Sequence, residues 1–139
     1  MREILFRGKR KNHIESHIYR SKYKNGDWVY GLITKCHPRE FWDKLNDEMT
    51  DTYGISGIEI DRDTVGQFTG LVDKNGEKIF EGDIIAKGFE LFEVKWNPEQ
   101  VRWGIYSDDY EVAGFTKFSE PYFEVIGNIY DNKELLEND

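Results

Sequence analysis

The sequence is poor in the residues that build disulfides, metal centres and membrane spans. It contains one cysteine, Cys36, and three histidines, so no internal disulfide can form and a four-ligand zinc site would have to draw on carboxylates. A chain without disulfides fits a reducing cytoplasm. Its apolar runs, such as Trp28–Tyr30, are only a few residues long, and no apolar stretch follows the basic N-terminus. We therefore expect neither a membrane-spanning helix nor a secretory signal.

The sequence also lacks the local signatures of common enzymes. It has no phosphate-binding loop and no dinucleotide fingerprint. Gly54–Gly57 places its serine third of four, which is not the G-x-S-x-G spacing of a nucleophile. Cys36 and His37 are adjacent, and adjacent side chains seldom orient toward each other for catalysis. We therefore expect no catalytic centre, no metal and no cofactor.

Two histidines and several acidic pairs remain as candidates for a metal or acid–base site. His13 and His17 would share a face of a helix or of a strand, but the residues between them do not give the H-E-x-x-H order of zinc proteases. Three acidic pairs fall at expected turns with no histidine beside them: Glu81 with Asp83, Asp61 with Asp63, and Asp108 with Asp109. Aspartate at a turn commonly accepts backbone N–H bonds. We therefore favour structural roles for the acidic pairs and exposed, titrating side chains for the histidines.

Aromatic residues and glycine, by contrast, are plentiful. Four Trp, eight Tyr and nine Phe make up 15% of the chain, and 13 glycines stand against three prolines. Aromatic side chains suit the half-buried surface of a sheet, and glycine suits tight turns. The 38% of hydrophobic residues is too high for a disordered chain, and 139 residues allow one domain or two very small ones. The composition predicts a mainly β protein.

Charge is distributed unevenly along the chain. The whole sequence carries a net charge of −8. Residues 1–25 hold eight basic and two acidic residues, a net +6, so residues 26–139 carry −14. We expect the basic stretch to attract the acidic remainder within the chain or between subunits. The alternative is a phosphate-binding arm in which Lys9, Arg10 and Lys11 contact anions, although the acidic remainder would repel nucleic acid unless it faced away.

Two regions with different patterns follow each other along the chain. Residues 1–64 read as a β-rich region with one short helix over about 38–49, where apolar residues recur every four positions. Residues 65–139 contain closely spaced short strands joined by glycine-bearing turns, followed by a short tail. Five or six such strands predict a small closed antiparallel barrel over about 65–131.

The turns of the second region allow a structural and a functional interpretation. Asp73–Gly76 is acidic enough to suggest a calcium loop, but its glycine is fourth rather than sixth, and Ile84 stands where an EF-hand needs glutamate. We therefore expect a hairpin turn. Gly76 and Gly82 both follow polar turn residues, and we expect positive φ and a structural role at each.

Several aromatic residues also allow two interpretations. A stacking platform for single-stranded nucleic acid is one, and its candidates are Trp28, Tyr30, Trp96, Trp103, Phe115 and Phe118. Aromatics at alternate strand positions more often belong to a core, and few basic residues surround Trp96 and Trp103. We favour the core.

Three motifs carry a resemblance to a known family. Residues 69–83 read TGLVDKNGEKIFEGD, residues 125–136 read VIGNIYDNKELL, and residues 1–8 read MREILFRG. Together they resemble the YopX family of phage and prophage proteins, with Asp131 and Lys133 standing where the family usually has Glu and Pro. The resemblance implies an SH3-like β-barrel in the C-terminal half and a phage origin. It implies no particular activity and supplies no catalytic residues.

Two functions fit these observations. The first is a non-enzymatic interaction module that binds a phage or host protein in the bacterial cytoplasm, as a homo-oligomer and without a membrane. Its binding surface should be an open sheet edge or an aromatic patch rimmed by charge. The second is a nucleic-acid-associated protein that uses the basic N-terminal stretch. Phosphate binding weakens steeply as salt rises, so a salt titration separates the two.

Overall fold

The computed structural model describes residues 3–11, 26–36, 52–56 and 58–137. The helix expected over 38–49, His13 with His17, and His37 lie outside the described residues. The chain divides into two compact units, Ile4–Gly66 and Gln67–Asp139, and Met1–Glu3 groups with the second. Each unit has its own cluster of buried apolar side chains.

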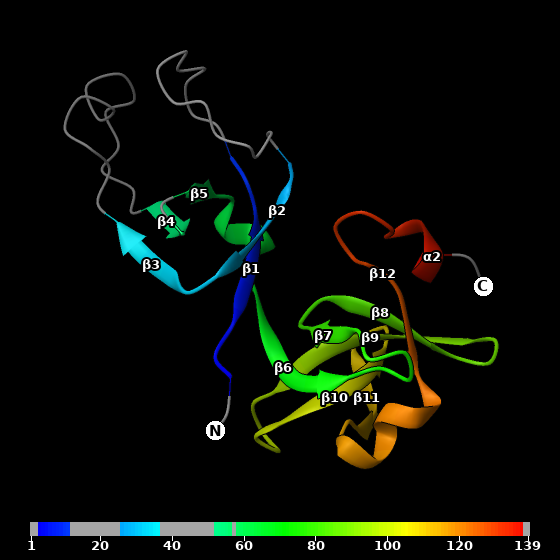
Figure 1. Ribbon diagram of the computed structural model, residues 1–139. Helices are drawn as coiled ribbons and strands as arrows, with labels where there is room; N and C mark the ends of the chain where they lie inside the picture. The colour runs from blue at the N-terminus through cyan, green and yellow to red at the C-terminus, as the bar shows by residue number, and fades with distance from the viewer. Residues whose placement is uncertain (1–2, 12–25, 37–51, 57, 138–139) are drawn as a thin grey trace. The chain divides into compact units, whose positions relative to one another are not determined.

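The described part of Ile4–Gly66 is made of short antiparallel strands (Figure 1). They are β1 (Phe6–Lys9), β2 (Trp28–Gly31), β3 (Ile33–Cys36), β4 (Thr52–Ile55) and β5 (Ile58–Ile60), followed by the 3₁₀ turn η1 (Arg62–Thr64). β1 pairs with β2, and β3, β4 and β5 form a three-stranded sheet. The buried core of the unit Ile4–Gly66 consists of Val29, Ile55 and Ile60. A Cβ on Gly8 would lie 2.6 Å from Cδ1 of Ile60, so β1 packs there without room for a side chain.

The unit Gln67–Asp139 contains a longer run of strands. They are β6 (Gly66–Val72), β7 (Lys78–Phe80), β8 (Asp83–Lys87), β9 (Glu90–Asn97), β10 (Arg102–Ser107), β11 (Tyr110–Gly114) and β12 (Glu124–Asn128), with the 3₁₀ turn η2 (Lys117–Tyr122) and the one-turn helix α2 (Glu134–Glu137). β6 pairs with β7, and the other five strands form an antiparallel sheet in the order β11-β10-β9-β8-β12. Figure 1 shows β8 and β9 continuing beyond the rest of the sheet as a long hairpin.

Alternating burial on the central strands builds the core of this unit. In β9, Phe92 and Val94 are buried, and in β10, Trp103 and Ile105 are buried. The residues between them face the other side of the sheet, because side chains alternate along a strand. The full cluster is Ile79, Ile85, Phe92, Val94, Trp103, Ile105, Phe115 and Phe123. Each such side chain contributes roughly 1.5–3 kcal/mol on full burial, so this cluster is the main stabilising element of the unit.

The closed barrel expected over residues 65–131 is not what the strand pairing shows. The protein is mainly β, with several antiparallel sheets, and among the described residues none of these sheets closes on itself. The chain leaves β11 through η2 and returns as β12, which pairs with β8 rather than with β11. Phe115 and Phe123 flank η2 and insert into the core with their rings 5.2 Å apart. β11 and β12 are therefore joined through η2 and the core, without strand pairing between them.

Candidate functional site

The carboxylate of Asp73 has a structural role. Asp73 is 3% exposed and lies in the turn between β6 and β7. Its Oδ1 accepts hydrogen bonds from the backbone N–H groups of Asn75 (2.8 Å) and Glu77 (2.9 Å), and its Oδ2 accepts one from Val125 (2.9 Å). The φ angle of Gly76 is +82°. The expected hairpin turn and the positive φ are confirmed, and the same carboxylate ties the turn to β12.

The Glu81-Gly82-Asp83 turn is structural in the same sense. Asp83 is 1% exposed, and its Oδ2 accepts a hydrogen bond of 2.7 Å from the N–H of Phe80. Gly82 has the expected positive φ, +89°, and its N–H and C=O bond the backbones of Val94 and Ile129. Burial raises the pKa of Glu81, and a hydrogen bond from the N–H of Gln67 opposes this.

The side chain of Asn128 holds together the motif of residues 125–136. Its Oδ1 accepts hydrogen bonds from the N–H groups of Tyr130 (3.0 Å) and Asp131 (2.9 Å), and its Nδ2 donates to Oδ2 of Asp131 at 3.0 Å. A Cβ on Gly127 would lie 2.5 Å from Oδ1 of Asn132. The side chains of Asp73, Asp83 and Asn128 are thus engaged in fixing turns.

The predicted anion contacts lie at consecutive positions at the end of β1. The backbone N–H groups of Lys9, Arg10 and Lys11 donate to Thr64 Oγ1 (2.8 Å), to the carbonyl of Asp27 (2.9 Å) and to that of Glu59 (3.0 Å), respectively. The side chain of Lys9 lies near the Trp28 ring, with Nζ 5.4 Å from its centroid. The structure explains their backbone positions, and anion binding by their side chains stays a prediction.

The aromatic candidates in Gln67–Asp139 divide between core and surface. Trp103 and Phe115 are buried, as expected for core residues. Trp96 packs on Trp103 edge to face, with centroids 5.1 Å apart and an interplanar angle of 73°. Phe118 is 89% exposed on η2, so assigning it to the core is wrong. Phe115 and Phe123 already fill the core at the two ends of η2, and the turn between them faces outward.

A groove lies beside the core of this same unit. Its volume is about 1040 Å³. We call it the hairpin groove, and its lining comes from the β8–β9 hairpin and β9 (Phe89, Glu90, Leu91, Phe92, Glu93, Lys95), from β10, β11 and their turn (Tyr106, Ser107, Asp108, Asp109, Tyr110, Val112), and from the C-terminal tail (Ile129, Tyr130, Lys133, Leu135, Leu136, Glu137). Leu91, Glu93 and Lys95 alternate with the core residues of β9, so their side chains lie on the face of the sheet opposite the core.

The hairpin groove is acidic. Five carboxylates and two ammonium groups line it, a net charge of −3. Burial raises the pKa of Glu93, the Lys95 ammonium 3.9 Å away lowers it, and the carboxylates of Asp109 and Glu81 raise it further. The groove therefore holds a negative charge that its own lysines only partly balance.

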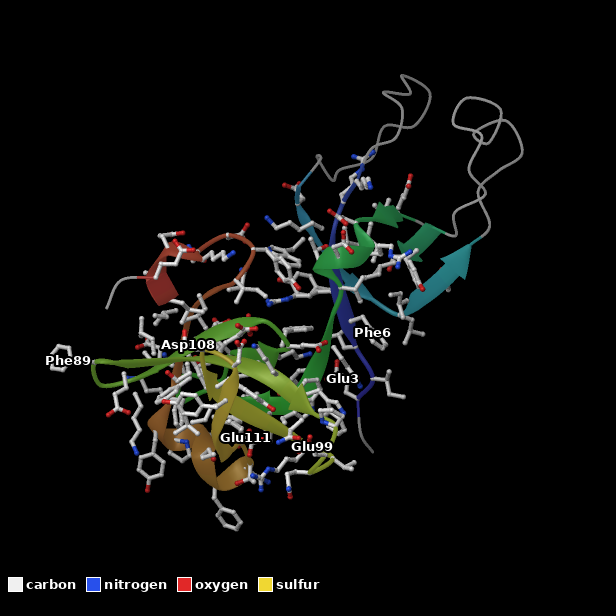
Figure 2. The ribbon with its side chains drawn as sticks, turned by 180° about the vertical axis from the view of Figure 1, so that it is seen from behind. Glu3, Phe6, Phe89, Glu99, Asp108 and Glu111 are labelled. Atoms are coloured by element: carbon white, nitrogen blue, oxygen red, sulfur yellow. The ribbon has the colours of Figure 1, made fainter. Side chains whose placement is uncertain are left out.

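Exposed apolar side chains stand beside this charge. Phe89 is fully exposed, and Tyr110 and Val112 of β11 are 63% and 47% exposed. Figure 2 shows the Phe89 ring at the tip of the β8–β9 hairpin, directed away from the body of the unit. β11 lies at the end of the five-stranded sheet, with β10 on one side and no strand of the described residues on the other. An apolar rim and an open sheet edge thus meet at one groove.

The described residues do not assemble a cluster of metal ligands. They contain no group of three or more His, Cys, Asp or Glu side chains that could hold a metal ion. In the same ranges no helix has the length and apolarity needed to cross a bilayer. The lining of the hairpin groove has carboxylates without a histidine. This arrangement can bind a cationic or apolar group.

The family model of the YopX protein matches residues 5–137. The chain belongs to the YopX family. A crystal structure of protein EF1440 from Enterococcus faecalis is similar in fold to this YopX chain, with a TM-score of 0.57 and 21% sequence identity, and the match covers 96% of this chain and 98% of that one. No curated protein matches the sequence.

The groove fits the kind of surface that the sequence predicts, although none of its residues was singled out as a binding residue. The sequence predicts a plain turn at Asp108 and Asp109 and a strand over residues 89–96 that includes Phe89. A signal was present: Phe89 stands between Gly88 and Glu90, an apolar residue at a turn, where a core residue is not expected. The structure adds the C-terminal tail, which sequence reasoning did not connect with this surface.

Proposed function

We propose that this YopX-family protein is a non-enzymatic protein-interaction module and that the hairpin groove is its binding surface. The observation that carries the proposal is the coincidence of exposed Phe89, Tyr110 and Val112 with a large groove and an open sheet edge. A single exposed apolar residue needs no explanation. Several of them around a groove are typical of a surface that a partner covers.

We further propose that the unit Gln67–Asp139 follows the plan of an SH3-like barrel and that the protein serves a phage or prophage in a bacterial cytoplasm. Membership of the YopX family supports both statements, and strands β6 to β10 and β12 contribute side chains to one shared core. The partner is then a phage or host protein, and a homo-oligomer is compatible with the same surface.

Capture of partners by the immobilised full-length protein tests the interaction function. Bacterial lysate is passed over the wild type, over Phe89→Ser and over Phe118→Ser. Phe118 is the matched control, because it is an equally exposed aromatic residue that does not line the groove. We expect a protein retained by the wild type and by the control variant and lost with Phe89→Ser. Equal retention by all three, or by none, contradicts the proposal.

The second candidate function is association with nucleic acid, favoured by the three consecutive basic residues Lys9, Arg10 and Lys11 at the end of β1. The test is the anisotropy of labelled single- and double-stranded DNA at increasing salt. Each phosphate contact steepens the fall of log K with log salt by roughly 0.7–0.9. A slope of about −2 to −2.7 that disappears when all three residues are changed to Ala would establish this function. Absence of binding at low salt would exclude it.

A further inference from the structure

The two edges of the five-stranded sheet differ in how they are covered. At the β12 edge, the N–H of Val125 bonds Oδ2 of Asp73, and the carbonyl of Phe123 accepts from the N–H of Lys74. The β6–β7 turn therefore occupies that edge. At the other end, β11 pairs only with β10 among the strands of the described residues. One edge is satisfied within the unit, and the other is open.

The open edge has only some of the features with which proteins usually block strand addition: the β10–β11 pairing shifts register between Ile105 and Tyr106, as at a β-bulge. Edge strands are commonly protected by lysine, proline or an inward-pointing charge. β11 reads YEVAG, with neither lysine nor proline. Its one charged side chain, Glu111, is engaged by Arg102 and Asn97 of the neighbouring strands. A Cβ on Gly104 would lie 2.7 Å from Oε2 of Glu111. The absence of a side chain at Gly104 therefore leaves room for this carboxylate over β10.

Acidic side chains lie beside the open edge of β11. Asp108 and Asp109 form the turn that leads into β11, and Glu93 lies in the same groove. The carboxylates of Glu93 and Asp109 are close enough that Asp109 raises the pKa of Glu93. A segment entering the groove therefore meets negative charge that Lys95 and Lys133 only partly balance, and lysine or arginine would relieve it. Phe89 and Tyr110 offer apolar contact next to that charge.

We propose that β11 and the hairpin groove dock an extended, lysine- or arginine-bearing segment of a partner protein, which adds to the sheet as a further strand. In strand addition, main-chain hydrogen bonds supply affinity, and alternate side chains supply specificity. Here basic side chains face Asp108 and Asp109 at the turn that leads into β11, and an apolar side chain contacts Phe89 or Tyr110. This inference rests on the proposed function and names the class of segment that the surface takes.

A pair of synthetic peptides tests it on the full-length protein. One is a labelled peptide of alternating Lys and Val with a central Phe, and the other replaces each Lys by Glu. We expect the basic peptide to bind and the acidic one not to bind. On binding, amide exchange should slow at residues 110–114, where the new strand would pair.

The matched variants separate local charge from total charge. Asp108→Asn with Asp109→Asn removes two charges at the groove, and Asp63→Asn with Glu77→Gln removes two exposed charges elsewhere. Asn also tolerates the positive φ of Asp108, +53°, so the groove variant should fold. We expect the groove variant to lose about fivefold in affinity, as two exposed ion pairs of roughly 0.5 kcal/mol each would give, and the control to lose nothing.

Equal binding of both peptides, an equal loss in both variants, or slowed exchange confined to residues outside β11 would overturn the inference. Failure of the basic peptide combined with Phe89-dependent capture of a lysate protein would overturn the inference and leave the interaction function standing. A concentration-dependent dimer with slowed exchange in β11 would assign the edge to a second copy of the chain instead.

Discussion

At the scale of single residues, the side chains that mark the family are acceptors for backbone N–H groups. Asp73 accepts three such bonds, from Asn75, Glu77 and Val125, and Asn128 accepts two. Carboxylate and amide oxygens can cross-link segments distant in sequence because they accept more than one bond. A conspicuous acidic motif in this chain thus fixes backbone geometry.

Asp73→Ala should lower the free energy of unfolding by about 3 kcal/mol, because three partly buried backbone hydrogen bonds lose their acceptor. Asp73→Asn should cost less, since one oxygen remains to accept from Asn75 and Glu77, while its amide nitrogen faces the N–H of Val125. Urea denaturation of the three proteins measures the difference. Equal stabilities for the wild type and Asp73→Ala would show that the carboxylate does not tie the turn to β12.

Glu93 and Glu111 should affect stability with opposite signs. Burial, together with the carboxylates of Asp109 and Glu81, raises the pKa of Glu93 above 4.5, whereas hydrogen bonds from Asn97 and Arg102 lower that of Glu111 below 4.5. Ionised Glu93 therefore costs stability at neutral pH, and the cost falls as pH drops through its raised pKa toward 4.5. Glu111 contributes stability above pH 4.5 and loses it as pH falls through its lowered pKa.

The corresponding measurement compares Glu93→Gln and Glu111→Gln by denaturation over a range of pH. At neutral pH we expect Glu93→Gln to be more stable than the wild type and Glu111→Gln to be less stable. Both differences should shrink toward low pH. The same sign for both variants at neutral pH would contradict the assignment.

At the scale of strands and turns, sequence patterns predict the pairing of strands that follow each other in the chain, but not the pairing of distant strands. They also do not predict every buried face, since Phe89 and Val101 of the alternating apolar positions are exposed. The alternation over residues 89–96 and 101–106 predicts β9 and β10 and their antiparallel pairing, and both are confirmed. The sequence pattern does not predict β11, because this strand contributes no buried side chain to the core. That β12 pairs with β8 was equally hidden, since alternation specifies a face and says nothing about a distant neighbour. The hairpin groove combines a hairpin tip, a turn and a tail, so local patterns could not reveal it.

Gly76 and Gly82 allow a test of turn geometry. Both have positive φ, but a Cβ on Gly76 meets nothing within 4 Å, whereas one on Gly82 would lie 3.3 Å from Cε2 of Tyr130. Gly76→Ala should cost about 1 kcal/mol from backbone strain alone. Gly82→Ala should cost more, because Tyr130 must also shift. Differential scanning calorimetry should show the lower Tm for Gly82→Ala, and the reverse order would contradict the geometry.

At the scale of the whole molecule, the two buried clusters do not share residues. The core of Gln67–Asp139 is drawn from positions 79–123, and that of Ile4–Gly66 from positions 29–60. A fragment of residues 66–139 should therefore unfold cooperatively by itself, with dispersed amide resonances. The full-length protein is the reference for the Tm of that unit. A broad, non-cooperative transition of the fragment would show that its core depends on the rest of the chain.

The edge-to-face contact of Trp96 with Trp103 gives the unit Gln67–Asp139 an optical label of its own. Two indoles 5.1 Å apart and inclined at 73° are close enough for their electronic transitions to couple. Such coupling produces a paired positive and negative band in circular dichroism, which vanishes once the rings separate. The amplitude of that couplet reports the integrity of β9 and β10, the strands beneath the groove, without an added dye.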